Sequence, residues 1–431
     1  MIKKELIKEI IREFHTSELP SSKKRNITIP LNTGKVISIT GVRRSGKTYM
    51  LFETIKGLLS SGIPKKRILY INFEDERFDL RLQELDLILQ SYRELYPDIR
   101  LSECYLFFDE VQNIQGWERF IRRLHDKVTR NIFITGSSSR LLSREIATTL
   151  RGRTLTYEIF PLSFAEFLRF HDIEIDIYNP VTKARIINLF EQFLLYGGFP
   201  EIIGLADIQL RNKILQEYLD VMLYRDLIER FNISNISVLR YFLKRVFENI
   251  TSPLSVNKIY NELRSQGYKL GKNTLYEFLD AAEAIYLFLI IKKYHGSVLK
   301  QELGEKKAYA IDNGLLNAIT YKFSKDLGKL LENTIFLELC KRGDGENTYF
   351  YKNKKEVDFI IIERERVNEI IQVSYSISDR ITLKREIEGL MTACKTFGIK
   401  EARLITYSEE DELVEGGIKI NIIPAYKWIL T

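Results

Sequence analysis

Hydrophobic side chains follow two alternating sequence patterns between Lys35 and about Phe160. Short runs of β-branched and aromatic residues alternate with longer stretches in which apolar residues recur every three or four positions. The short runs predict strands, and the longer stretches predict amphipathic helices. Strands are expected at 36–40, 67–73, 104–108, 131–135 and 154–159. This alternation predicts an α/β fold in which a parallel sheet is covered by helices on both faces.

The pattern becomes mainly helical after Phe160 and changes again after residue 284. The last of these helices would be followed by a strand at 285–293, a turn at 295–297 and a return strand at 298–301. Three helices joined to such a β-hairpin have the pattern of a winged helix-turn-helix. The helices are expected at 161–170, 180–195, 206–231, 236–247, 255–266 and 272–284.

The two ends of the chain have patterns of their own. Apolar residues at helical spacing predict an amphipathic helix over 2–14, and the polar link 21–26 follows it. From Leu327 onward, a helix and strands at 348–351, 357–362 and 369–373 predict a further α/β unit. The predicted parts are the N-terminal helix and link at 1–30, the parallel-sheet domain at 31–205, a helical and winged-helix domain at 206–320, and a C-terminal domain at 321–431.

Composition narrows the class of protein. Charged residues make up 29% and hydrophobic residues 45% of the 431 residues, as in ordinary soluble proteins. No apolar run is long enough to cross a membrane, and the N-terminus does not resemble a signal peptide. The 3 cysteines are scattered, which argues against a disulfide framework or a zinc site. We expect a cytoplasmic protein with no membrane partner, and the net charge of +7 mildly favours an anionic partner such as nucleic acid.

Residues 41–48 have the sequence Gly-Val-Arg-Arg-Ser-Gly-Lys-Thr, a complete phosphate-binding loop between a predicted strand and a predicted helix. Its glycines permit a tight backbone path whose N–H groups face phosphate oxygens at a helix N-terminus. Lys47 is expected to reach the β- and γ-phosphates, and the Thr48 hydroxyl to bind Mg²⁺. The motif predicts binding of ATP or GTP. The residues expected at the nucleotide are Gly41, Val42, Arg43, Arg44, Ser45, Gly46, Lys47, Thr48 and Tyr49.

A second motif supplies the acids of a hydrolytic site. The apolar strand 104–108 ends in Asp109 and Glu110, about sixty residues after the phosphate loop and with one strand between. Asp109 is expected near the Mg²⁺ ion, and Glu110 is expected to orient and deprotonate the attacking water. The segment 74–77 ends the preceding strand and is expected to line the same site.

Polar and basic residues after the next strand are further catalytic candidates. Ser137 and Ser138 can hold the attacking water or the γ-phosphate, or one of them can cap the following helix. Arg151 or Arg153 can stabilise negative charge on the nucleotide of a neighbouring subunit, or form a solvated basic turn. An arginine that acts on a neighbouring subunit requires a homo-oligomer, and a hexameric ring is one such arrangement.

With these motifs the chain resembles the archaeal and bacterial AAA-type ATPases that carry a C-terminal domain of unknown function. The resemblance extends over nearly the whole chain and implies an AAA+-like P-loop NTPase core, a winged-helix middle domain and a restriction-endonuclease-like C-terminal fold. Its marks are the phosphate loop, Phe107–Gln112, Ile134–Ser138, Gly152-Arg153 with Phe160–Glu166, Tyr196–Pro200, Tyr224–Asp226 and Ile311–Leu315.

The resemblance also implies where a nuclease site would lie. Such a fold uses a helix Glu, a strand Asp and a Glu-x-Lys on the next strand. Glu332 and Asp358 match the first two, but Gln372 and Ser374 stand where Glu and Lys are expected. A neutral amide and a hydroxyl supply neither metal charge nor a cation. The C-terminal domain is therefore expected to be degenerate and to bind DNA or support assembly rather than cleave DNA.

The winged-helix hypothesis gives a set of DNA-binding candidates. The helix 272–284 would be the recognition helix, with base and phosphate contacts near its N-terminal end. Lysines beside the hairpin would meet phosphates, although such domains also bind proteins. The candidates are Lys269, Lys272, Asn273, Tyr276, Lys292 and Lys293.

The sequence thus predicts an ATPase that uses Mg²⁺ and binds or remodels DNA, as a ring-forming motor in recombination or repair. The alternative is a nucleotide-driven switch or scaffold that binds protein partners and hydrolyses slowly. An ATP-gated nuclease is disfavoured by Gln372 and Ser374.

Overall fold

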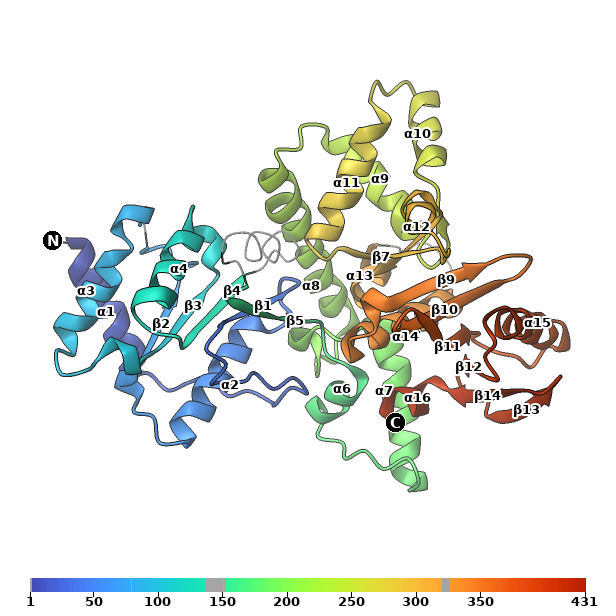
Figure 1. The fold of residues 1–431 in the computed structure, drawn as a ribbon, viewed down its shortest axis with the longest axis horizontal. Helices are drawn as coiled ribbons and strands as arrows, with labels where there is room; N and C mark the ends of the chain where they lie inside the picture. The colour runs from blue at the N-terminus through green and yellow to red at the C-terminus, as the bar shows by residue number, and fades with distance from the viewer. Residues whose placement is uncertain (1, 79, 137–149, 151, 320–325) are drawn as a thin grey trace. The chain divides into compact units, whose positions relative to one another are not determined.

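The computed structural model describes residues 2–78, 80–136, 150, 152–319 and 326–431. The chain divides into two compact units (Figure 1). Unit 1 contains residues 1–160 and 284–286, and unit 2 contains residues 161–283 and 287–431. The predicted division into four domains stays a prediction, because smaller domains can lie within one compact unit.

Unit 1 is built on a five-stranded sheet with the order β2-β3-β4-β1-β5. All neighbouring strands of this sheet are parallel, so their C-terminal ends share one edge. The predicted parallel sheet is confirmed. The strands are β1 (Val36–Gly41), β2 (Ile68–Asn72), β3 (Tyr105–Asp109), β4 (Ile132–Gly136) and β5 (Thr154–Ile159).

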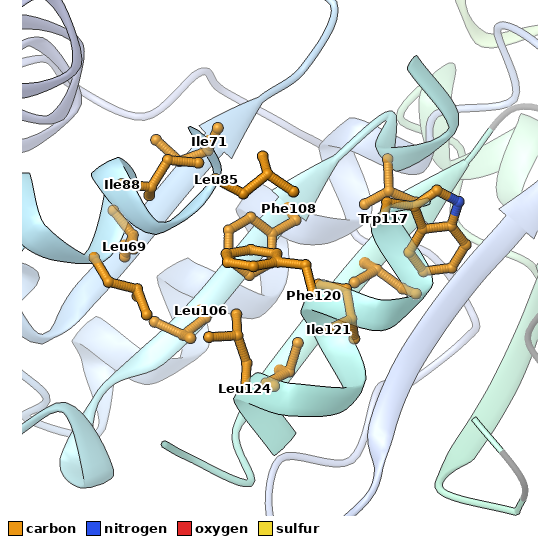
Figure 2. Packing of buried hydrophobic residues seen from close by; sticks show 14 of the residues in the cluster. Leu69, Ile71, Leu85, Ile88, Leu106, Phe108, Trp117, Phe120, Ile121 and Leu124 are labelled. Atoms are coloured by element: carbon orange, nitrogen blue, oxygen red, sulfur yellow. The ribbon is translucent and has the colours of Figure 1, made fainter. Parts of the chain in front are cut away.

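Helices cover both faces of this sheet. Alternate side chains of a strand point to opposite faces, so Leu106 and Phe108 of β3 join one core while Phe107 joins the other. The first core contains α3, α4 and part of α1, and its close packing is seen in Figure 2. The second contains α2. The helices are α1 (Ile2–Thr16), α2 (Lys47–Ser60), α3 (Asp86–Leu95) and α4 (Trp117–Lys127).

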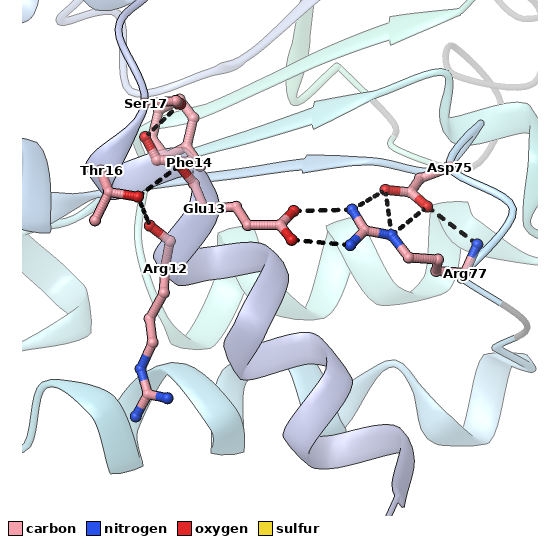
Figure 3. Close-up of polar contacts among 7 residues, drawn as sticks. All are labelled: Arg12, Glu13, Phe14, Thr16, Ser17, Asp75 and Arg77. Atoms are coloured by element: carbon pink, nitrogen blue, oxygen red, sulfur yellow. Dashed lines mark hydrogen bonds and ion pairs between the residues drawn. The ribbon is translucent and has the colours of Figure 1, made fainter.

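The N-terminal helix is fastened to the loop that follows β2. The Arg77 guanidinium donates hydrogen bonds of 3.1 and 2.9 Å to the two carboxylate oxygens of Glu13, and three to the Asp75 carboxylate, the shortest of 2.8 Å (Figure 3). These hydrogen bonds hold the pKa of the Glu13 and Asp75 carboxyls below their usual range. Two residues of the segment 74–77 therefore anchor α1, in addition to any role at the sheet edge.

Unit 2 begins with helices and a small antiparallel sheet of order β6-β8-β7. The helices are α6 (Phe164–Phe170), α7 (Pro180–Tyr196), α8 (Ile208–Val221), which continues as a π-helix over Met222–Glu229, α9 (Ile236–Glu248), α10 (Val256–Ser265), α11 (Lys272–Ala284) and α12 (Val298–Leu303). The strands are β6 (Pro253–Leu254), β7 (Phe288–Lys292) and β8 (Lys306–Ala310).

The predicted return strand at 298–301 is wrong. This segment belongs to α12, and the strand that pairs with β7 is β8. The run Leu-Lys-Gln-Glu-Leu consists of good helix formers, and its apolar residues Leu299 and Leu303 are exposed. Ala308, Tyr309 and Ala310 of β8 are fully buried and give β7 the apolar neighbour that a strand needs.

The C-terminal part of unit 2 is a six-stranded mixed sheet with the order β13-β14-β12-β11-β10-β9. Its core lies between the sheet and α15. The strands are β9 (Thr348–Lys352), β10 (Glu356–Glu363), β11 (Arg366–Val373), β12 (Glu401–Thr406), β13 (Asp411–Glu415) and β14 (Ile418–Pro424). The helices are α13 (Asn313–Ile319), α14 (Leu327–Arg342), α15 (Arg380–Phe397) and α16 (Ala425–Leu430). No helix in the described part of the chain has both the length and the apolar character needed to cross a membrane.

Candidate functional site

The phosphate loop connects the end of β1 to the start of α2. Gly46 precedes the first residue of α2 with a φ of 98°, so the loop needs glycine there for its left-handed backbone. Gly41 is needed for a different reason. A Cβ at this position would come within 2.1 Å of the Ile159 carbonyl oxygen at the end of β5. The first glycine of the motif is thus required by strand packing beside the loop.

Two side chains of the loop face inward. Lys47 is buried, and its ammonium donates a 3.1 Å hydrogen bond to the Val42 carbonyl oxygen within the same loop. The Ser45 hydroxyl is buried and has no hydrogen-bond partner among the described residues. An orphaned buried hydroxyl beside a buried lysine, at a helix N-terminus, suits a bound phosphate group. The loop therefore fits the nucleotide that its sequence predicts.

Asp109 ends β3 and is held by hydroxyl groups. Thr135 of β4 donates a hydrogen bond to one carboxylate oxygen, and Tyr70 of β2 donates one of 2.9 Å to the other. The Thr48 side chain also lowers the pKa of this carboxylate. Burial and the neighbouring Glu110 raise the pKa of Asp109, against the effect of these hydrogen bonds. Burial and the Asp109 charge raise the pKa of Tyr70, so its hydroxyl remains a donor.

Glu110 follows in a backbone conformation that is unusual for a side-chain-bearing residue. Its φ is 53°, in the left-handed region, and such strain is frequently found at functional sites. Its backbone N–H donates a 2.9 Å hydrogen bond to the Thr135 hydroxyl oxygen, and its carboxylate accepts one from the Gln112 amide. One hydroxyl, that of Thr135, therefore positions both acids.

Arg25 is a site residue that the sequence did not reveal. Its guanidinium donates 2.9 Å hydrogen bonds to the carbonyl oxygens of Ser45 and Phe160, and so ties the phosphate loop to the end of β5. The residue lies in a polar stretch with the composition of a linker, and no local pattern distinguishes it from its basic neighbours. Tyr70 was missed for a similar reason, because it belongs to an apolar strand.

The remaining loop arginines have distinct environments. Arg43 lies 3.5 Å from the Glu74 carboxylate, which follows β2, so part of the segment 74–77 does reach the loop. Arg44 has a φ of 67°, the second strained residue of the site. Tyr49 is half exposed on the first turn of α2.

The remaining catalytic candidates are the two serines that follow β4 and the two arginines that precede β5. Ser137, Ser138 and Arg151 lie outside the described residues. Arg153 precedes β5, at the edge of the sheet opposite the phosphate loop, and its guanidinium forms a 2.9 Å ion pair with Asp126. In its own chain Arg153 is therefore not beside the phosphate loop, and a role at the nucleotide of another subunit stays a prediction.

The DNA-binding candidates fall into two groups. Lys292 and Lys293 form ion pairs of 2.6 Å with Glu302 and 3.6 Å with Glu305. The others lie at or before the N-terminal turns of α11, where Lys269, Asn273 and Tyr276 are exposed and the Lys272 ammonium lies 5.6 Å from the Tyr276 ring centroid. The second group is the better placed for an external partner, because its positive charge is not matched by a glutamate in these contacts.

Three of the four nuclease-site candidates lie together in unit 2. The Asp358 N–H donates a 3.1 Å hydrogen bond to the Gln372 amide oxygen. The Lys307 ammonium donates hydrogen bonds of 3.2 Å to both Glu332 and Asp358 and so links these two acids. Ser374 instead donates to the Ser376 carbonyl oxygen. Lys307 was missed because it belongs to β8, outside the predicted motif.

The segments 196–200 and 311–315 of unit 2, two of the motifs on which the family resemblance rests, contact each other around the buried carboxylate of Asp312. Asp312 accepts 2.7 Å hydrogen bonds from the backbone N–H groups of Gly198 and Gly314. A Cβ at Gly197 would come within 2.0 Å of Asp312. Burial raises the pKa of Asp312 to about 6. The segments 196–200 and 311–315 are therefore explained by packing in the core.

Comparisons with known proteins agree with the site in unit 1. Residues 33–168 match the family described as AAA domain, and 187–326 and 327–428 match domains of unknown function named DUF8612 and DUF4143. The uncharacterized protein MJ1544 of Methanocaldococcus jannaschii is 39% identical over 444 residues, which cover 100% of this chain and 96% of that protein. An uncharacterized protein of Haemophilus influenzae is 30% identical over 395 residues, covering 91% and 93%.

Solved structures give weaker matches. AMPPCP-bound DnaA from Aquifex aeolicus is 15% identical, with 65% of this chain and 86% of that chain covered at a TM-score of 0.24. A Drosophila ORC structure with GC-rich DNA and Cdc6 is 9% identical, with 74% and 93% covered at a TM-score of 0.20. At these TM-scores neither likeness adds to what the family match says.

Proposed function

The chain belongs to the same family as the uncharacterized protein MJ1544 of Methanocaldococcus jannaschii, and its residues 33–168 match an AAA domain. On that premise we propose that it is a Mg²⁺-dependent ATPase. One observation carries the proposal. The phosphate loop at the end of β1, the two acids at the end of β3 and the Thr135 hydroxyl on β4 gather at one edge of a parallel sheet. Ligands of open α/β sheets bind at this edge.

Each residue has a task that its position supports. The loop N–H groups and Lys47 bind the phosphates, and Thr48 and Asp109 hold the metal ion. Bound Mg²⁺ would neutralise phosphate charge as a Lewis acid. Glu110 accepts a proton from water. The Thr135 hydroxyl holds Glu110 and Asp109 in their relative positions through its hydrogen bonds to both residues. Arg25 holds the loop in the conformation that binds phosphate.

The test is the pair Glu110→Gln and Glu118→Gln. Glu118 lies in the first turn of α4 and provides a matched loss of one carboxylate that is not among the proposed site residues. Glu110→Gln is expected to keep ATP binding and lose turnover, whereas Glu118→Gln keeps both. Unchanged turnover in Glu110→Gln would overturn the assignment of the base.

We further propose that the ATPase acts on DNA through α9–α11 and the small sheet of unit 2. The order helix, short strand, two helices and two strands supports a winged-helix domain. Exposed Lys269, Asn273 and Tyr276, with Lys272, then form the contact surface. ATP turnover is measured with single-stranded, duplex and branched DNA at low salt, where phosphate contacts are strongest. Absence of both stimulation and binding would contradict DNA contact.

A paired substitution locates the DNA contact. Lys269→Ala with Lys272→Ala is expected to weaken DNA binding more than Lys292→Ala, because Lys292 is already paired with Glu302. Equal effects would contradict the proposed surface.

The proposal includes a cytoplasmic homo-oligomer in which Arg151 or Arg153 reaches the nucleotide of a neighbouring subunit. A strict monomer, by mass measurement with and without nucleotide, would leave these arginines without that role.

The C-terminal segment 321–431 is proposed to have a degenerate nuclease-like fold, which the clustering of Glu332, Asp358 and Gln372 supports.

The alternative function is a slow nucleotide switch that binds protein partners. It is favoured by the ion-paired state of Lys292 and Lys293 and by the exposed apolar residues of α12. DNA-independent turnover together with a nucleotide-dependent protein partner would establish it.

A further inference from the structure

A buried ammonium lies among three carboxylates in unit 2. Lys307 of β8 has 1% of its side chain exposed. Its Nζ atom lies 2.8 Å from Glu356, 3.2 Å from Glu332 and 3.2 Å from Asp358. The acids come from α14 and β10, so two elements besides β8 place side chains around this one cation.

The carboxylates of this cluster have a cation of the protein itself as their partner. Burial disfavours a charged lysine, but the three carboxylates outweigh burial and raise the pKa of Lys307. Burial and the Asp358 charge raise the pKa of Glu332 to about 8, and Tyr309 donates a 2.8 Å hydrogen bond to it. The second oxygen of Glu356 lies 3.7 Å from Lys352. Two ammonium groups, those of Lys307 and Lys352, therefore lie among the three carboxylates.

The neighbours of the cluster complete its hydrogen bonding. The Val373 N–H donates a 3.1 Å hydrogen bond to Asp358, and the Asp358 N–H donates to Gln372. Glu386 of α15 is buried next to Gln372 and is paired with Arg385. Groups of the protein itself therefore already engage the carboxylates of the cluster.

We propose that the Lys307 ammonium is the resident cation of this cluster and occupies the position that a divalent metal ion would need. Carboxylates bind Mg²⁺ at about 2.1 Å and Ca²⁺ at about 2.3–2.6 Å, whereas an ammonium is accommodated at the longer distances found here. A metal ion would have to expel an ammonium that is enclosed by protein. No group of three or more acids, histidines or cysteines in the described ranges is arranged to hold a metal ion.

Replacing the ammonium tests the proposal. Lys307→Met keeps an unbranched side chain of similar length and leaves the carboxylates without their cation. The three carboxylates are then expected to bind a divalent ion, because unpaired buried carboxylates are costly. Nucleotide-free protein is titrated with Mn²⁺ and followed by thermal unfolding and by electron paramagnetic resonance of free Mn²⁺. Each protein is compared with its Asp358→Asn counterpart, so that Mn²⁺ at the phosphate loop is subtracted.

In wild type we expect Mn²⁺ binding to be the same with and without Asp358→Asn. In Lys307→Met we expect a lowered Tm that Mn²⁺ raises, and about one additional Mn²⁺ per chain that disappears in the double variant. Binding in wild type that depends on Asp358, or Mn²⁺-dependent DNA cleavage that Asp358→Asn abolishes, would overturn the proposal. So would a folded Lys307→Met protein with no Mn²⁺ response.

If Lys307→Met does not fold, the wild-type comparison decides alone, since equal Mn²⁺ binding with and without Asp358→Asn supports an internal cation and unequal binding refutes it. The outcome does not depend on ATP turnover, so it is separable from the proposed ATPase.

Discussion

The two clusters of buried acids in this protein are held in opposite ways. In unit 1, Asp109 is oriented by the hydroxyl groups of Thr135 and Tyr70, which are neutral. In unit 2, Asp358 is paired with the Lys307 ammonium. Hydroxyl donors fix the direction of a carboxylate and leave its charge available to a metal ion, whereas an ammonium neutralises it. Both sites contain buried acids, so the acids alone do not distinguish them. The hydrogen-bond partner does, because hydroxyl groups leave the Asp109 site ready for a metal ion, whereas the Lys307 ammonium already occupies the Asp358 site.

The largest expected effect follows from removing the internal cation. Lys307→Met is expected to lower the free energy of unfolding by about 3–5 kcal/mol, because it leaves buried charges uncompensated. Lys352→Met is the control, since Lys352 is more exposed and lies 3.7 Å from Glu356. It is expected to cost about 1 kcal/mol or less. Chemical denaturation measures both, and equal losses would remove the distinction between the two lysines.

The hydroxyl that joins the two acids of unit 1 comes next. Thr135→Val keeps the shape of the side chain but removes both of its hydrogen bonds, and is expected to lower kcat about 100-fold through misplaced acids. Thr135→Ser keeps the hydroxyl and should retain most of the activity. Steady-state kinetics separates kcat from KM. A loss confined to KM would contradict a positioning role.

Asp312 is a third buried carboxylate, and it is held by backbone N–H groups rather than by hydroxyl groups or an ammonium. Its pKa is raised to about 6 in the folded protein, above the ordinary value of 3.8. Between these values the folded state binds more protons than the unfolded state, so stability falls as pH rises. The loss is of the order of 3 kcal/mol. Urea unfolding across pH 4–7 should show this slope in wild type and lack it in Asp312→Asn; equal slopes would refute the assignment.

The smallest effect is expected for the loop anchor. Arg25→Ala removes two hydrogen bonds to backbone carbonyls and should weaken ATP binding about tenfold, with kcat little changed. Lys24→Ala, at an exposed neighbouring position, should bind ATP normally. Binding of a fluorescent ATP analogue measures both. If Arg25→Ala binds ATP as tightly as Lys24→Ala, the guanidinium does not shape the loop.

The sequence predicted what depends on local pattern. Strands β1–β5 follow from apolar runs, and the phosphate loop follows from spacing alone. Contacts between distant segments were not predictable. Arg25 meets Ser45 from a linker-like stretch, and Lys307 meets Asp358 from a strand 51 residues earlier. The strand prediction failed at 298–301, where helix-forming residues outweighed two apolar positions.

The most direct test places one acid of each site in the same assay. Phosphate release from ATP is measured for wild type, Glu110→Gln and Asp358→Asn, with folding checked by circular dichroism. The account predicts that Glu110→Gln loses turnover by about 100-fold or more, because it removes the base, while Asp358→Asn stays within about twofold of wild type, a difference of less than 1 kcal/mol in the barrier. Turnover that survives in Glu110→Gln, or that is lost in Asp358→Asn, would contradict it.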